Sequence, residues 1–129
     1  MTGIDLEAIG EAAEETVLIA AQNDRFRQTF GADFTIPGRI VCTQGVAAYG
    51  GGFQQILMVL LMQFDSFTED NDPHGHRDFG ILQVPYRGET VRVYWKIDLY
   101  DRACEYGSPA PADPNQTCRV LTLLLPSEY

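Results

Sequence analysis

Apolar residues recur at steps of three and four along the first part of the chain. The recurring positions are Leu6, Ile9, Ala13, Val17 and Ala20, and the acids Glu7, Glu11, Glu14 and Glu15 occupy other faces. This spacing predicts an amphipathic helix. Asp5 is its expected N-cap and Gly31 its expected stop, unless Asn23 and Asp24 interrupt it.

A second helix is expected just after the three glycines at 50–52. Apolar residues recur there at helical spacing, at Phe53, Ile56, Leu57, Leu60 and Phe64, and Met58, Leu61 and Met62 widen the apolar face. Such a helix is expected to be largely buried. Between the two helices, the β-prone run from Arg39 to Thr43 predicts a short strand.

Strict alternation of apolar and polar residues predicts a long strand from Thr90 to Tyr100. The run from Phe79 to Tyr86 can pair with it through a turn at residues 87–88, which makes a β-hairpin. Pro85 cannot donate a ladder hydrogen bond, so it is expected near a strand end or on an edge strand. A Pro-rich stretch then leads to a final apolar strand from Arg119 to Leu125.

The order of these elements predicts the fold class. Helix, strand, helix and three strands show no regular alternation of the kind that builds a parallel sheet. We therefore expect one α+β domain over residues 1–129, with an antiparallel sheet of about four strands and two helices packed on one face.

The chain is acidic, with a formal net charge of −9 from eighteen acidic and nine basic residues. This balance disfavours direct binding to nucleic acid, which draws on Lys and Arg to displace counterions. An acidic surface keeps a protein soluble or faces a basic protein patch. No apolar run is long enough to span a bilayer, and a cytoplasmic location is expected.

The three cysteines, Cys42, Cys104 and Cys118, are an odd number without C-x-x-C spacing. That pattern fits neither a disulfide framework nor a zinc knuckle. Reduced core thiols are therefore expected.

The connection between Phe67 and Phe79 concentrates acids and both histidines of the chain. Its candidate ligands for a divalent metal are Asp70, Asp72, His74 and Asp78. Carboxylates suit hard cations, and imidazole joined to carboxylate suits transition metals. The spacing matches neither an EF-hand loop nor H-E-x-x-H, and a solvated connection whose acids cap backbone amides is the competing interpretation. No other cofactor is predicted.

One face of the long strand carries the candidate catalytic residues Tyr94, Lys96 and Asp98, with Asp101 just beyond. Residues two apart on a strand are neighbours, so Lys96 can act as a general acid with Asp98 as its charge partner. A surface ion pair explains the same residues without catalysis. The chain shows no nucleophile elbow or phosphate-binding loop.

Several motifs resemble an uncharacterised family of small bacterial proteins, classed as a domain of unknown function. The matching stretches are Phe64-Asp65-x-Phe67-Thr68-Glu69-Asp70-Asn71-Asp72-Pro73-His74-Gly75, Asp78-Phe79-Gly80, Trp95-Lys96-Ile97-Asp98-x-Tyr100-Asp101, Arg119-Val120-Leu121-Thr122 and Ser127-Glu128-Tyr129. The resemblance implies a cytosolic protein of plasmids and conjugative elements, encoded beside replication, partition and antirestriction genes. His76 departs from the acidic residue expected there, which weakens a metal role for that histidine.

These observations lead to three hypotheses about function. The leading one is a non-enzymatic accessory protein of mobile DNA that acts through an unidentified protein partner, in host defence or plasmid maintenance. The alternative is a small metal-dependent or acid/base enzyme that uses the acidic loop and the strand face. The third is a homodimer formed through the edge of the hairpin.

Overall fold

The computed structural model describes residues 5–129. Its elements are α1 (Leu6–Gln28), β1 (Gly38–Cys42), α2 (Gln44–Ala47), α3 (Gly51–Gln63), β2 (Phe79–Tyr86), β3 (Glu89–Tyr100), β4 (Cys118–Leu124) and the 3₁₀ turns η1 (Pro114–Gln116) and η2 (Pro126–Glu128). The two longer helices and the four strands confirm the sequence prediction, and the class is α+β. The short elements α2, η1 and η2 were not predicted.

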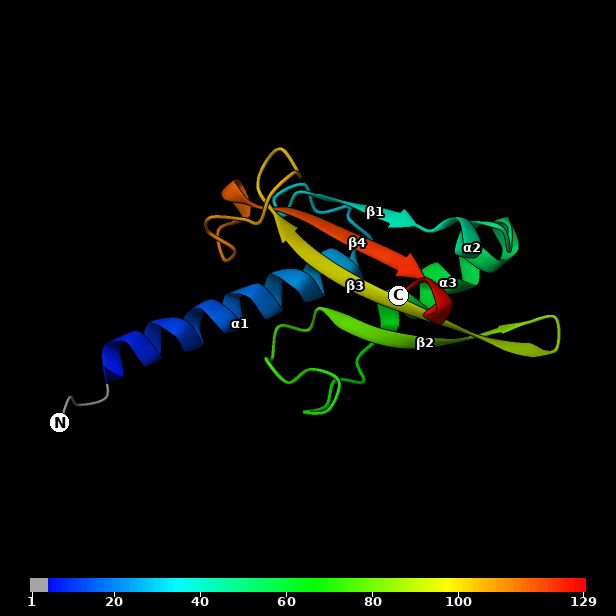
Figure 1. Cartoon of the computed structure of the whole chain (residues 1–129), viewed down its shortest axis with the longest axis horizontal. Coiled ribbons are helices and arrows are strands. Elements are labelled where there is room, and N and C mark those ends of the chain that lie inside the picture. The colour runs from blue at the N-terminus through cyan, green and yellow to red at the C-terminus, as the bar shows by residue number, and fades with distance from the viewer. Residues whose placement is uncertain (1–4) are drawn as a thin grey trace.

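The four strands form one sheet in the order β1-β4-β3-β2 (Figure 1). The β2–β3 and β3–β4 pairs are antiparallel, which confirms the predicted sheet, whereas β1 and β4 at its edge form one parallel pair. Strands joined by short connections must reverse direction, but β1 and β4 are separated by α2, α3 and the hairpin. A long connection leaves either direction open.

The structure confirms the predicted hairpin, including its two-residue turn and the place of Pro85 on an edge strand. Arg87 and Gly88 both have positive φ, at 51° and 79°, as a two-residue type I′ turn requires. Pro85 lies in β2, which is an edge strand, so its missing N–H costs no ladder bond.

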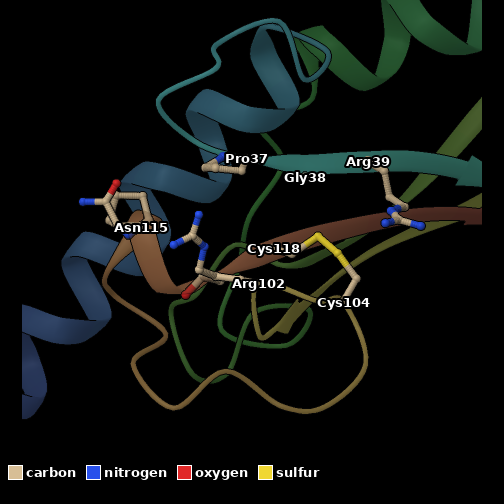
Figure 2. A pocket seen from close by; sticks show the side chains of 9 residues that line it. Pro37, Gly38, Arg39, Arg102, Cys104, Asn115 and Cys118 are labelled. Carbon is tan, nitrogen blue, oxygen red and sulfur yellow. A yellow bond between two sulfur atoms is a disulfide. The ribbon is translucent and has the colours of Figure 1, made fainter.

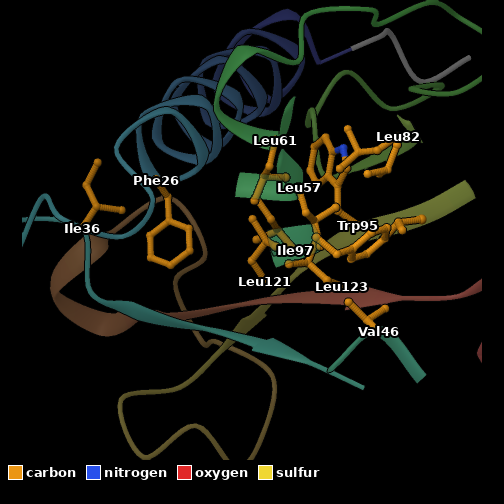
Figure 3. Close-up of a cluster of buried hydrophobic side chains, with 13 residues drawn as sticks. Phe26, Ile36, Val46, Leu57, Leu61, Leu82, Trp95, Ile97, Leu121 and Leu123 are labelled. Atoms are coloured by element: carbon orange, nitrogen blue, oxygen red, sulfur yellow. The ribbon is translucent and has the colours of Figure 1, made fainter. Parts of the chain in front are cut away.

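One hydrophobic core joins the sheet to α1 and α3 (Figure 3). Its members from the sheet are Leu82, Val84, Val93, Trp95, Ile97, Leu121 and Leu123, and the helices add Phe26, Phe53, Leu57 and Leu61. Met58, expected to widen the buried face of α3, is instead 36% exposed. The packing of both helices on a single face of the sheet stays a prediction.

The long helix α1 begins as predicted but buries a different face. Asp5 accepts hydrogen bonds from the Glu7 and Ala8 amides as the N-cap, and the helix runs through residues 23–24 without interruption. The apolar stripe that predicted it is exposed, with Leu6 78% and Val17 66% accessible. The buried positions are Ile19, Asn23, Phe26 and Arg27. The first half of α1 extends beyond the sheet (Figure 1).

Gly80 in β2 allows the Trp95 indole to lie against the strand backbone. A Cβ added at Gly80 would collide with Trp95 Nε1 and would lie 2.6 Å from Phe64 Cζ. Trp95 is fully buried between β2 and α3, so its ring has little room to move. The close approach therefore requires glycine at this position.

Gly80→Ala is expected to lower the free energy of unfolding by about 1–3 kcal/mol, because it overpacks the Trp95 site. Gly52→Ala is the matched control, since a Cβ there meets no atom within 4 Å. The control is expected to be neutral or stabilising by up to about 1 kcal/mol, as Ala favours a helix over Gly. Urea unfolding of both variants measures the difference, and equal midpoints would contradict the packing described here.

Candidate functional site

The outward side chains of the four strands form a second surface, opposite the core residues Val93, Trp95 and Ile97. We call it the outer face. Strand alternation and pairing register assign to it Arg39, Val41, Phe79, Ile81, Gln83, Arg92, Tyr94, Lys96, Asp98, Tyr100, Val120, Thr122 and Leu124. Aromatic and aliphatic side chains thus mix with the Lys96–Asp98 pair and with arginine on this surface.

Lys96 and Asp98 form an ion pair in the middle of the outer face. Their side-chain nitrogen and oxygen atoms are 3.1 Å apart, and the side chains are 40% and 39% exposed. The sequence left open whether the two residues form an acid/base pair or an ion pair. The structure shows the ion pair, and a catalytic role for Lys96 and Asp98 stays a prediction.

A shallow hollow of about 430 Å³ lies beside this ion pair. It is lined by Thr43, Lys96, Asp98, Tyr100, Val120, Thr122, Leu124, Glu128 and Tyr129. Of the other two catalytic candidates, Tyr94 lies next to it through contact with Tyr129. Asp101 does not line it, because its carboxylate caps the turn after β3 by accepting from the Glu105 and Tyr106 amides.

The last residues of the chain close one side of the hollow. The Glu128 carboxylate accepts hydrogen bonds from the Thr43 hydroxyl at 2.6 Å, the Leu125 amide at 2.8 Å and the Gly45 amide at 3.2 Å. The bond from Thr43, followed by that from the Leu125 amide, holds the pKa of Glu128 below its usual value. This anchoring fixes the C-terminal turn against the ends of β1 and β4.

Tyr129 completes an aromatic cluster with Phe79 and Tyr94. Its ring centroid lies 5.8 Å from that of Tyr94 and 6.2 Å from that of Phe79, and those two rings lie 5.5 Å apart. All three pairs meet edge to face, the favourable geometry for aromatic rings. Sequence periodicity missed Tyr129, and only the resemblance over residues 127–129 singled out this part of the chain.

The connection between Phe67 and Phe79, here called the acidic loop, folds mainly against α1 and not across the outer face. The Asn23 side chain donates to the His76 carbonyl oxygen at 2.9 Å, and the Arg77 guanidinium pairs with Asp24 at 2.7 Å. Only the end of the loop meets β3, where the Ile97 amide donates to the Asp78 carbonyl oxygen. The loop and the strand face therefore adjoin at one corner.

The four metal-ligand candidates are dispersed along this loop. Asp70 and His74 are exposed, and the Asp72 carboxylate accepts a hydrogen bond from the Arg77 amide at 3.0 Å. Across residues 5–129, no three His, Cys, Asp or Glu side chains are grouped so that they could hold a metal ion. The metal site stays a prediction without geometric support.

Asp78, at the end of the loop, has a partly buried carboxylate with a raised pKa. Burial raises its pKa above the usual 3.8, and the nearby charges of Asp72 and Asp98 raise it further, against the opposing effect of His76. Removing this carboxylate from water therefore costs stability whenever it is ionised.

A second hollow, of about 530 Å³, lies where β1 and β4 begin (Figure 2). A Cys104–Cys118 disulfide lines it, which corrects the expectation of reduced core thiols. The Pro-rich connection turns back on itself and brings the two Cα atoms to 5.6 Å, within bonding range. Cys42 is free and exposed, so an odd count of cysteines did not exclude one bridge.

We expect Asp78→Asn to stabilise the protein at pH 7. The folded chain binds the Asp78 proton more tightly than the unfolded chain does, so the cost of ionised Asp78 is present above its folded pKa and absent below the unfolded value near 3.8. The gain should therefore shrink as the pH falls toward 4. Urea unfolding at both pH values tests this, and the exposed Asp70→Asn control should shift stability by no more than about 0.5 kcal/mol at either pH.

Thiol titration of the native chain is expected to label Cys42 alone, and titration after unfolding with reductant should label all three cysteines. Breaking the Cys104–Cys118 bond should lower the free energy of unfolding by about 3 kcal/mol, because the bond closes a loop between residues 14 positions apart and so restricts the unfolded chain. Cys42→Ser should leave stability unchanged. Three reactive thiols in the purified, unreduced protein would show that the bond does not form.

Comparison with known protein families matches residues 42–128 to a family of unknown function, DUF3768. The matched stretch includes the acidic loop, the hairpin and most of the outer face, and it leaves α1 outside. No curated protein and no solved structure matches the chain, and none of its helices within residues 5–129 is both long and apolar enough to cross a membrane. Because the match spans more than half of the sequence, the chain belongs to the DUF3768 family of proteins of unknown function.

Proposed function

We propose that this domain is a non-enzymatic binding protein and that its outer face contacts a protein partner. The observation that carries the proposal is the aromatic cluster of Phe79, Tyr94 and Tyr129 beside the Lys96–Asp98 pair. Tyr129 is 77% exposed although its ring is held by two neighbours. Rigid, exposed aromatic side chains next to a charged pair are typical of the residues that dominate binding energy in protein interfaces.

The shape of the outer face also favours a protein over a small ligand. The charged side chains that line its hollow already have partners, since Lys96 pairs with Asp98 and Glu128 accepts a hydrogen bond from Thr43. Small-molecule sites usually enclose the ligand and direct several free polar groups at it. A broad surface of aromatic, aliphatic and paired charged groups is what a protein partner buries.

We further propose that the protein is an accessory factor of bacterial mobile DNA, acting in the cytoplasm on a host defence or plasmid-maintenance system. The resemblance to small plasmid-associated proteins supports this setting. Disulfides are rare in the reducing cytoplasm, so there the Cys104–Cys118 pair would be an exception or would be reduced. The enzyme alternative and the hairpin-edge homodimer stay predictions from the sequence.

Tyr129→Ala is expected to weaken capture of the partner by about tenfold or more, because it removes one ring of the aromatic cluster. Tyr106→Ala is the matched control, since Tyr106 is 73% exposed but lies in the β3–β4 connection away from the cluster. Immobilised wild-type and variant proteins would be compared against lysates enriched in host restriction, defence and replication proteins. The proposal would be contradicted if Tyr129→Ala and Tyr106→Ala retained the same amount of partner protein, or if the wild type retained none.

A further inference from the structure

The first half of α1 carries an apolar stripe that no other part of residues 5–129 covers. Leu6, Ile9 and Val17 are each more than half exposed, and the first fully buried side chain of the helix is Ile19. At about 100° per residue, the stripe lies roughly a third of a turn from the face that buries Ile19 and Phe26. The stripe is therefore a separate surface and not an extension of the core face, and Figure 1 shows this part of α1 standing away from the sheet.

A shallow, mainly apolar hollow lies on this stripe. It measures about 410 Å³ and is lined by Ala13, Glu14, Val17 and Leu18. Small and branched residues three and four positions apart form the grooves into which a second helix places its side chains. A helical segment without tertiary contacts is also only marginally stable, so a partner helix packed on its apolar face would stabilise it.

The charges on α1 determine which kind of partner helix can pack on the stripe. Residues 5–24 contain six acids and no Lys or Arg. Glu7, Glu11 and Glu14 follow one flank of the stripe at helical spacing, where like charges repel one another. A second copy of this chain would bring the same acids in either orientation, and an anionic membrane surface would also be repelled. A row of cations on the partner would relieve the repulsion.

We propose that residues 6–18 of α1 dock a basic amphipathic helix of another protein, with its apolar face on the stripe and its Lys or Arg residues beside the glutamates. The contact would run for roughly 20 Å along the two helices. This inference goes beyond the outer-face interaction and does not depend on it, because α1 lies outside the residues that define the family match.

The probe for this test is an 18-residue peptide with Leu at helical i, i+3, i+4 spacing and Lys elsewhere, and a second peptide carries Glu in place of Lys. We expect the full-length protein to bind the Leu/Lys peptide in calorimetry and not the Leu/Glu peptide. The double variant Ile9→Gln, Val17→Gln should weaken binding at least tenfold, and Glu11→Gln, Glu14→Gln should weaken it severalfold. Val59→Gln, at an exposed apolar position of α3, is the matched control and should bind like the wild type.

Circular dichroism is expected to show the same secondary structure in each variant as in the wild type, because the altered side chains are exposed. The proposal is overturned if the wild type binds neither peptide, if it binds both equally, or if the double stripe variant keeps full affinity, which would indicate charge attraction alone. It is also overturned if light scattering shows a dimer that the stripe variant abolishes, or if anionic vesicles retain the protein through the stripe. Tyr129→Ala should bind the peptide normally, so a failure here would leave the outer-face proposal standing.

Discussion

The position of α1 depends on a buried arginine that has no carboxylate partner. Arg119 of β4 is fully buried, and it donates to the side-chain oxygens of Asn23 at 2.9 Å and Gln22 at 2.8 Å. The same two amides donate onward to the His76 and Ala112 carbonyl oxygens. Burial lowers the pKa of Arg119 to about 10, so it is still charged at neutral pH. Hydrogen bonds replace water at Nε and Nη2, although Nη1 is buried without a partner among the described residues, and these bonds hold the helix, the acidic loop and the Pro-rich connection together.

A second buried arginine fixes the same half of the helix from the other side. Arg27 donates to Asp24 and to the Phe64 carbonyl oxygen, and its guanidinium lies 5.4 Å from the Trp95 ring centroid. Together with the core side chain Phe26, the two arginines attach the second half of α1 to the rest of the fold. This explains why the apolar stripe of the first half takes no part in the docking of α1, and why residues 23–24, whose polarity suggested a break, lie at the centre of the helix attachment.

Sequence periodicity predicted the type of each long element and the faces of its residues. It did not predict the contacts between elements that are distant in the sequence. Alternation located β3 and placed Lys96 and Asp98 on one face, because the pleat alone determines that relation. The direction of β1 and the Cys104–Cys118 bond depend on how long connections return to the sheet, and the approach of Tyr129 to Tyr94 depends on how the turn after β4 folds onto β3. No period within one segment carries that information. The stripe on α1 predicted the helix but not its surroundings, since an apolar face indicates a contact and does not specify which surface covers it.

The distribution of charge separates the molecule into two parts with different binding chemistry. Residues 5–24 hold six of the eighteen acids, while residues 25–129 hold the other twelve together with all nine basic residues, for a net charge of −3. The net negative charge is therefore mainly a property of residues 5–24, and residues 25–129, which carry the outer face, are closer to neutral. Electrostatic attraction acts over roughly a Debye length, about 8 Å at physiological salt, so the field of α1 acts chiefly on whatever approaches the helix. Binding at the outer face must then draw on its aromatic and aliphatic side chains, whereas binding at α1 must draw on charge as well as on apolar contact.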